Sequence, residues 1–342
     1  MVRSAAEMLA CFFMSAIIAS NSVQWPTMII RIMGDPHNNL DMEEDGYWLS
    51  QADVALCTGD FAYHITGRER SLSRKVMEFL RDCGVYTILG NHDGINHRPS
   101  VNYGPAETEP GCQTEMVETL GDYYMGYQCV DLENLSLVGG RPFSNGNSGI
   151  QHKPFGYRDI TVEESAQKIV SLMEAAAHDN IIFLSHNGPK GMGEDRDSMC
   201  GRDWKQPAMD WGDEDLALAL NHVPEGKNIV ALVMGHMHHH LRGGGWRRRM
   251  AFYKGYPVVN AAVVPRIVRK GVITTRNITG EFKEKKIFQT HHHFLELELE
   301  GNRLKEVRDL WVCKGNRNSL GTKMLIWRES IHGWGQREKS TE

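Results

Sequence analysis

Five short apolar segments, each followed closely by a polar block, constrain this chain more than any other feature of its sequence. The apolar segments are rich in Ile, Val and Leu, and they span residues 28–33, 54–57, 85–89, 181–184 and 229–234. Runs of this length and composition are typical of strands buried on both faces. The polar blocks are Asp35-Pro36-His37, Gly59-Asp60, Gly90-Asn91-His92-Asp93, Ser185-His186-Asn187 and Gly235-His236-Met237-His238. They follow the carboxyl ends of predicted strands, which is where open α/β sheets place their sites.

The side chains in these blocks are those that bind divalent cations. Carboxylate, amide carbonyl and imidazole donors suit hard and borderline metal ions, and the mixture leaves Mn, Fe and Zn open. Two such ions about 3.5–4 Å apart can bind one phosphoryl group and activate water. An isolated buried His or Asp is more often a hydrogen-bonded structural group than a ligand. Five such blocks at successive strand ends make the ligand role the better interpretation, and together they predict two divalent metal ions.

The order of these blocks resembles that of the calcineurin-like metallophosphoesterases. Further motifs are similar to a branch of that superfamily found in cyanobacteria and plant plastids. They are Gly139-Gly140-Arg141-Pro142-Phe143, His186-Asn187-Gly188-Pro189, Cys200-Gly201-Arg202-Asp203-Trp204, Trp211-Gly212-Asp213-Glu214-Asp215 and Val264-Pro265-Arg266. The resemblance runs from about residue 28 to residue 314. It implies an α/β fold in which two sheets form a sandwich flanked by helices.

The resemblance also implies a role for each residue of the blocks. One metal ion would be bound by Asp35, His37, Asp60 and His238, and the second by Asp60, Asn91, His186 and His236. Asp60 would bridge the two ions, because one carboxylate can bind both and offset their repulsion. His92 would be the general acid, and Asp93 would orient its ring. Strand alternation favours His236 and His238 over the following His239 and His240, because alternate side chains share a face.

The implied reaction is hydrolysis of a phosphate monoester or diester. A hydroxide formed at the metals would attack phosphorus while His92 protonates the departing alcohol. Arg141, Arg202 and Arg266 are candidates to bind the substrate phosphate, because a guanidinium can donate to two oxygens at once. Each arginine alone is more often a surface or ion-pair residue. We expect substrate choice to depend on residues 188–215, which include Trp204 and Trp211, and a packed structural loop is the alternative.

Two other functional classes stay open, a nuclease and a catalytically silent binding scaffold. The net charge of −5 and the lack of a long basic stripe weigh against nucleic acid as a partner. The complete ligand set weighs against the scaffold. The run Trp246-Arg247-Arg248-Arg249 is expected in a solvated loop, with contact to an anionic substrate as the alternative. The expected partner is therefore a small phosphorylated substrate.

The sequence divides into three parts. Residues 1–27 contain an apolar stretch that is too short for a stable membrane span, which needs about 20 residues. This part is predicted to be a targeting-like or disordered segment. The resemblance favours a plastid (chloroplast) location over the secretory pathway or the cytoplasm. Residues 28–314 form the predicted catalytic domain, and residues 315–342 are expected to be a loosely held tail.

Other elements follow from periodicity and turn residues. Helical patterns occur at residues 71–83 and 161–177, and the second opens close to a capping box. Residues 94–132 are predicted to form a long loop with one helix near residues 113–120. Residues 294–300 and 303–313 flank Gly301-Asn302 and predict a C-terminal antiparallel hairpin. His291, His292 and His293 are expected to form its polar entry, with a third metal site as the alternative.

Overall fold

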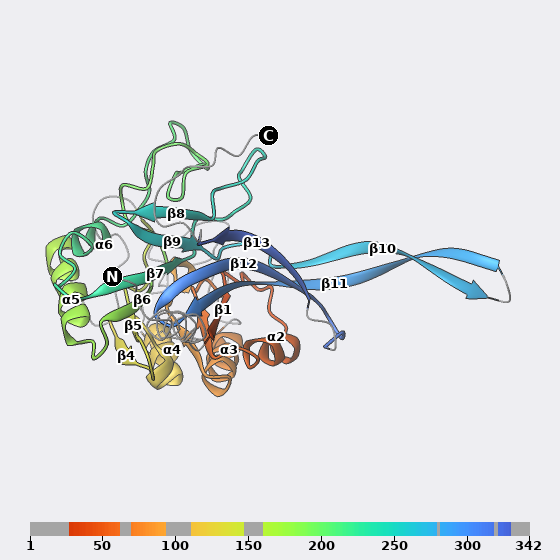
Figure 1. The fold of residues 1–342 in the computed structure, drawn as a ribbon, viewed down its shortest axis with the longest axis horizontal. Coiled ribbons are helices and arrows are strands. Elements are labelled where there is room, and N and C mark those ends of the chain that lie inside the picture. Colours follow the sequence, from red (N-terminus) through yellow and green to blue (C-terminus); the bar gives the residue numbers. More distant parts are fainter. Residues whose placement is uncertain are drawn as a thin grey trace, which may run out of the picture.

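Two β-sheets packed face to face form the centre of the protein (Figure 1). We describe it from a computed structural model of residues 27–61, 70–93, 111–146, 160–278, 281–317 and 321–329, so the predicted targeting segment lies outside the described residues, apart from residue 27. The first sheet has the order β13 (Thr322–Arg328), β12 (Arg303–Cys313), β11 (Glu281–Glu300), β1 (Thr27–Met33), β2 (Val54–Cys57) and β3 (Val85–Thr87), with β10 (Ile267–Ile278) paired to β11. The second sheet has the order β4 (Cys129–Asp131), β5 (Ser136–Gly139), β6 (Asn180–Leu184), β7 (Asn228–Met234), β9 (Tyr256–Asn260) and β8 (Met250–Tyr253). The predicted two-sheet α/β fold is confirmed.

The five strands predicted from apolar runs lie in the parallel parts of the two sheets. β1 pairs with β2 and β2 with β3 in parallel, and β5, β6, β7 and β9 form a second parallel set. Their bounds differ from the predicted ones by at most two residues. Because parallel strands end at the same edge of a sheet, their polar blocks leave from one end of each sheet.

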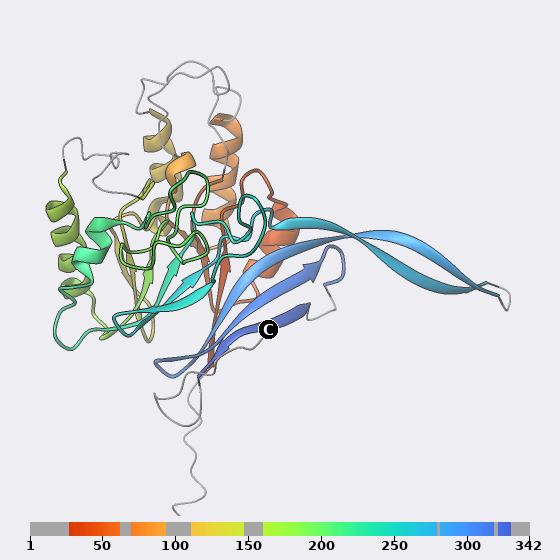
Figure 2. The same ribbon diagram turned by 90° about the horizontal axis from the view of Figure 1, so that it is seen from above.

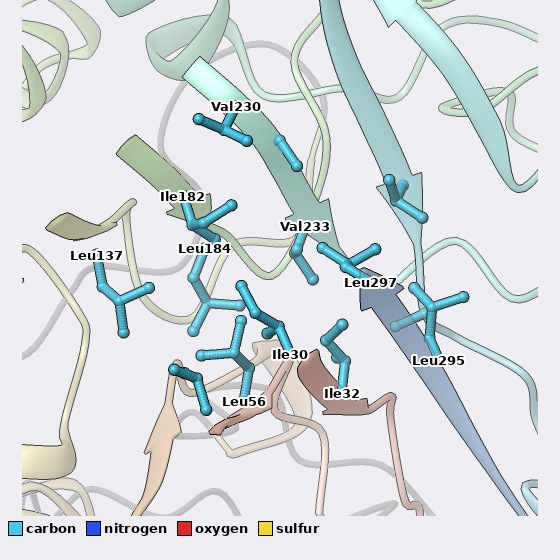
Figure 3. Close-up of a cluster of buried hydrophobic side chains, with 14 of the residues drawn as sticks. Ile30, Ile32, Leu56, Leu137, Ile182, Leu184, Val230, Val233, Leu295 and Leu297 are labelled. Carbon is cyan, nitrogen blue, oxygen red and sulfur yellow. The ribbon is translucent and has the colours of Figure 1, made fainter. Parts of the chain in front are cut away.

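Buried side chains fall into three layers, one between the sheets and one on each outer face. Ile30, Leu56, Leu184, Val233 and Leu297 belong to the layer between the sheets, where side chains from both sheets meet (Figure 3). On the outer face of the first sheet lie α2 (Met42–Leu49), α3 (Arg70–Asp82) and α4 (Gly111–Leu120). On the outer face of the second lie α5 (Val162–Ala175) and α6 (Glu214–Ala219). Burial on both faces explains why these strands read as continuous apolar runs.

The predicted helices form where the sequence provides a start signal and an apolar stripe. Thr161 and Glu164 make the reciprocal hydrogen bonds of a capping box at the start of α5, as predicted. In α3, Val76, Met77 and Leu80 are buried against the first sheet. Residues 94–110 of the predicted long loop are outside the described residues, whereas α4 takes the place of its predicted helix. Among the described residues, no helix combines the length and apolar character that crossing a membrane requires.

The C-terminal hairpin is confirmed, but its first strand is much longer than predicted. β11 and β12 pair antiparallel, as expected. However, β11 begins at Glu281, well before the predicted start at residue 294. Its first part pairs with β10 as a ribbon that extends away from the body of the protein (Figure 2). The two strands of this ribbon pair through their backbone N–H and C=O groups. Such pairing does not require an alternation of apolar and polar residues in the sequence.

Two other expectations for the C-terminal region are wrong. The prediction of a loosely held tail is wrong for Thr322–Arg328, because this segment forms β13 and pairs with β12 at the edge of the first sheet. Ile326 and Trp327 of this strand pack against the central apolar layer. The prediction of a polar entry to the hairpin is wrong as well, because His292 and His293 lie inside β11 and are buried. Their rings form hydrogen bonds with Asp45 and Asp309, respectively.

Candidate metal centre

The five polar blocks converge at the adjoining ends of the two sheets. Asp35 and His37 follow β1, Asp60 follows β2, and Asn91 to Asp93 form a short 3-10 helix after β3. His186 follows β6 of the second sheet, and His236 and His238 follow β7. The packing of the two sheets therefore brings together side chains that are up to 203 residues apart in the sequence.

Ligand atoms from these blocks form three overlapping groups in which all atoms lie within 4.8 Å of one another. The groups are Asp35, His37 and His238; His37, Asp60 and His92; and Asp60, His186 and His236. Asp60 Oδ2 lies 3.7 Å from His37 Nε2 and 3.4 Å from His186 Nε2, so it stands between the two predicted ligand sets. Asn91 Oδ1 lies 3.0 Å from His186 Nε2, as expected of a ligand in the second set.

The donor atoms fit divalent cations. His37 Nε2 and His238 Nε2 face each other at 3.0 Å, and at least one of them presents a lone pair there. His236 Nε2 is buried and has no hydrogen-bond partner among the described residues. His186 donates from Nδ1 to the Thr58 carbonyl at 2.7 Å, which directs Nε2 toward Asp60. Such a backbone contact fixes the ring of a metal-binding histidine in many proteins.

Thr58 is a residue that the sequence reasoning missed. Its hydroxyl donates to Asp35 Oδ1 at 2.7 Å, and the His236 backbone N–H donates to Asp35 Oδ2 at 2.6 Å. These contacts hold Asp35 between loops from different sheets. The only local signal was the position of Thr58 beside the Gly59-Asp60 block.

Burial and mutual charge set the protonation of the ligands. Burial lowers the pKa of His37 to about 3 and that of His238 to about 4, and it also lowers the pKa of His236. These rings are therefore neutral near pH 7, which is the form that binds metal. Burial opposes ionisation of Asp60, but the adjacent histidines, led by His186, outweigh it and hold the pKa of that carboxyl well below its usual range.

His186 behaves in the opposite way. Burial favours its neutral form, but the Asp60 carboxylate, together with Asp35 and the hydrogen bond to Thr58, raises its pKa to about 10. Without a bound cation, His186 therefore carries a positive charge next to Asp60. A metal ion would replace that proton, so metal binding at this position releases a proton near pH 7.

The loops that carry the ligands have an unusual backbone. Asp35, His37, Asp60 and His236 all have positive φ, at 37°, 42°, 57° and 60°. This region costs about 1–3 kcal/mol for a residue with a side chain and is concentrated at functional sites. Because the backbone of His236 is in the left-handed region and not extended, the alternation of side chains along a strand does not apply to it. The structure nevertheless brings His236 and His238 to the two predicted ligand sets.

Two glycines of the blocks are needed for this close approach. A Cβ atom on Gly90 would collide with the side chains of Asp60 and His186. A Cβ atom on Gly235 would collide with Asp35 and Thr58. Both glycines therefore allow the ligand loops to touch.

Asp93 has different contacts from those predicted. Its carboxylate accepts hydrogen bonds from the backbone N–H groups of Asp60 and Gly90 at 2.8 Å and of Phe61 at 2.9 Å. It thus joins the loops after β2 and β3. These contacts favour a role in positioning the loops over the predicted role of orienting the His92 ring. His92 itself is half-buried, and its ring centroid lies 5.1 Å from that of His37.

The three arginines that were predicted to bind phosphate lie in different surroundings, and their contacts differ from those predicted. Arg141 is buried and donates to Asp213 and Asp215 at 2.9 and 2.8 Å. Arg266 is fully buried and donates to both oxygens of Asp45 at 2.8 Å. The carboxylates already accept hydrogen bonds from the guanidinium N–H groups that would bind a phosphate. The contacts therefore support an ion-pair role for both arginines. Sequence reasoning missed the pairing because the partners lie 72 or more residues away.

Arg202 packs against an aromatic ring instead. Its guanidinium carbon is 5.0 Å from the Trp211 ring centroid, and its Nη2 donates to the Pro207 carbonyl at 2.7 Å.

The run from Trp246 to Arg249 was expected to lie in a solvated loop. This expectation is wrong for Arg247 and Arg249, which are only 2% and 7% exposed. Arg247 donates to the carbonyls of His238 and Ser198 and thereby supports the last ligand block.

A family model described as calcineurin-like phosphoesterase matches residues 28–240, which contain all five blocks. No curated protein matches the chain. Among solved structures, the chain is similar to a hypothetical protein from Thermus thermophilus, at 14% identity over 84% of this chain and 99% of that one, with a TM-score of 0.40.

Two further solved structures are similar at the same low level. The calcineurin-like phosphoesterase YfkN from Bacillus subtilis is 15% identical over 77% of this chain and 90% of that one, with a TM-score of 0.36. The 5'-nucleotidase precursor from Thermus thermophilus is 15% identical over 84% of this chain and 54% of that one, with a TM-score of 0.43. The family assignment rests on the family model, which matches more than half of the chain. The chain therefore belongs to the calcineurin-like phosphoesterase family.

Proposed function

We propose that the protein hydrolyses a phosphate monoester or diester with two divalent metal ions that share Asp60. The observation that carries the proposal is the position of Asp60 Oδ2 between His37 and His186, within reach of both ligand sets. A carboxylate at that position can bind two cations and offset their repulsion. Bound ions would polarise the phosphoryl oxygens and lower the pKa of water.

Several contacts of the chain position the candidate ligands for this role. His37, His236 and His238 are kept neutral by burial and are ready to bind a cation. Thr58 directs both Asp35 and His186, one through its hydroxyl and one through its carbonyl. Because these supports are hydrogen bonds between different loops, the ligands are positioned before a substrate arrives.

His92 is the residue proposed to donate a proton to the leaving oxygen. Its backbone N–H donates to Asp60 Oδ1 at 2.8 Å, which fixes the residue beside the shared carboxylate. Its ring nitrogen also belongs to one of the three ligand groups. The geometry therefore allows His92 to act as an acid or as a ligand, and metal content distinguishes the two.

The test is the Asp60→Asn variant, compared with Asp131→Asn on β4 as a control that removes one carboxylate charge elsewhere. Wild-type protein is treated with chelator, reloaded with manganese and assayed on aryl monoesters, aryl diesters and a panel of phosphorylated metabolites. We expect activity to return with manganese, and Asp60→Asn to bind less metal and lose most of its turnover while remaining folded. Full activity in Asp60→Asn would refute the shared-ligand proposal. Lack of manganese-dependent hydrolysis of every ester in the panel would favour the binding scaffold.

A further inference from the structure

An exposed tryptophan borders the candidate metal centre. Trp204 is 38% exposed, and its ring centroid lies 6.4 Å from that of His236, a predicted metal ligand. The two rings meet at 81°, and Trp204 meets the Trp211 ring at 82° with a centroid distance of 5.4 Å. A large apolar side chain therefore stays open to solvent at the edge of the site.

Trp211 is a fixed support for Trp204. Its indole N–H donates to the Asn145 carbonyl at 2.6 Å, and its own carbonyl accepts from Asn187 at 2.9 Å. The Arg202 guanidinium lies over its ring. Since Asn187 follows the ligand His186, this support is tied directly to one of the ligand loops.

The segment before Trp204 is tied to the other ligand loop. Asp203 accepts from the Arg242 backbone N–H at 2.6 Å and pairs with Arg247 at 3.3 Å. Arg247 in turn donates to the His238 carbonyl at 3.1 Å. The chain next to Trp204 is therefore anchored, although the Trp204 ring itself is exposed.

Other large apolar side chains are exposed as well. In the part of the chain that the structure describes, they are Met209, Trp246, Phe252, Phe288, Met324 and Leu325. The ring of Trp246 contacts His239 and His240, which are outside the predicted ligand sets. The position of Trp204 next to a ligand thus calls for an explanation beyond general surface composition.

We propose that the substrate is a phosphate ester whose leaving group carries a planar aromatic ring, and that this ring stacks on Trp204. The proposal rests on the proposed phosphoesterase function and names its substrate class. Aromatic rings pair favourably at centroid distances of about 4.5–7 Å, and a fixed tryptophan offers such a surface with little loss of side-chain entropy. Because Trp204 adjoins His236, the ring and the phosphoryl group are separated by a short linker. A nucleobase and a simple aryl or benzyl group share this chemistry.

The test uses pairs of esters that have the same type of leaving oxygen and differ in the ring. AMP is compared with ribose 5-phosphate, and benzyl phosphate with cyclohexylmethyl phosphate, with the methyl diesters of the second pair as the diester arm. We expect the wild type to prefer the aromatic member of at least one pair, mainly through KM. Trp204→Ala should reduce that preference about tenfold or more, which is the size expected for stacking on one ring. Trp204→Phe should retain most of it, and the control Phe252→Ala, on β8, should leave it unchanged.

Binding of non-hydrolysable probes gives a second readout. The Kd of manganese-loaded protein is measured for benzylphosphonate and for cyclohexylmethylphosphonate. Tighter binding of the aromatic probe that is lost in Trp204→Ala supports the proposal. Equal binding and equal turnover within each pair, or a preference that survives in Trp204→Ala, would overturn it while leaving the phosphoesterase function intact. If the wild type hydrolyses no ester, the phosphoesterase proposal fails and the phosphonate comparison decides whether Trp204 binds aromatic rings.

Discussion

Replacing Asp93 by Asn tests whether this carboxylate joins the ligand loops or orients the His92 ring. Asp93 is 1% exposed and accepts three backbone hydrogen bonds, two at Oδ2 and one at Oδ1. If it joins the loops, the variant should lose stability and should lose activity with every substrate. If it orients His92, the loss should depend on the leaving group.

The magnitude follows from the hydrogen bonds. The amide oxygen of Asn can keep the two bonds from Asp60 and Gly90, but the amide NH2 then faces the Phe61 N–H. One bond to a charged acceptor is lost, and a buried donor is left unsatisfied, at about 1–3 kcal/mol for each effect. Burial and the Asp60 charge raise the pKa of Asp93 to about 6, so removing the charge recovers part of this cost. We expect a net loss of about 1–3 kcal/mol in the free energy of unfolding.

The assay is denaturant unfolding of the manganese-loaded protein, together with kcat/KM for a nitrophenyl ester and an alkyl ester. Asp53→Asn is the control, because Asp53 accepts one exposed backbone hydrogen bond from Ile29, at 2.7 Å. We expect Asp93→Asn to unfold at lower denaturant and to lose kcat/KM by similar factors for both esters. Unchanged stability, with a loss confined to the alkyl ester, would refute the loop-joining role.

Three further predictions concern the acid, the buried histidine and the buried ion pair. His92→Ala should keep its metal content and lose about 10²–10⁴-fold in rate for alkyl esters but much less for nitrophenyl esters, and equal losses would count against a general acid. Burial lowers the pKa of His293 to about 4, so the unfolded chain binds more protons than the folded one between about pH 6.5 and pH 4. Stability should therefore fall by about 2 kcal/mol between pH 7 and pH 5 in metal-loaded protein, and His293→Gln should remove that part of the slope in denaturant unfolding. Asp45→Ala should destabilise the protein by about 3–5 kcal/mol, because it leaves the Arg266 charge buried without a carboxylate, and an unchanged unfolding midpoint would contradict the ion-pair role.

Local patterns allowed much of the fold to be predicted. The parallel strands were recognisable because burial on both faces requires a continuous apolar run. The ligand blocks were recognisable because they follow those runs. β13 and the β10–β11 ribbon were missed because backbone pairing at a sheet edge imposes little pattern on the side chains.

The sequence by itself determined which side chains are available to bind metal and the order in which the strands present them. Tertiary structure alone decided which carboxylate each buried, ion-paired arginine meets. Arg266 meets Asp45 across 221 residues, and Trp204 meets His236 across a shorter stretch that contains α6 and β7, through the packing of segments that carry no common pattern. Periodicity reports the environment along one segment, whereas ion pairing and ring contacts depend on which segments become neighbours when two sheets pack.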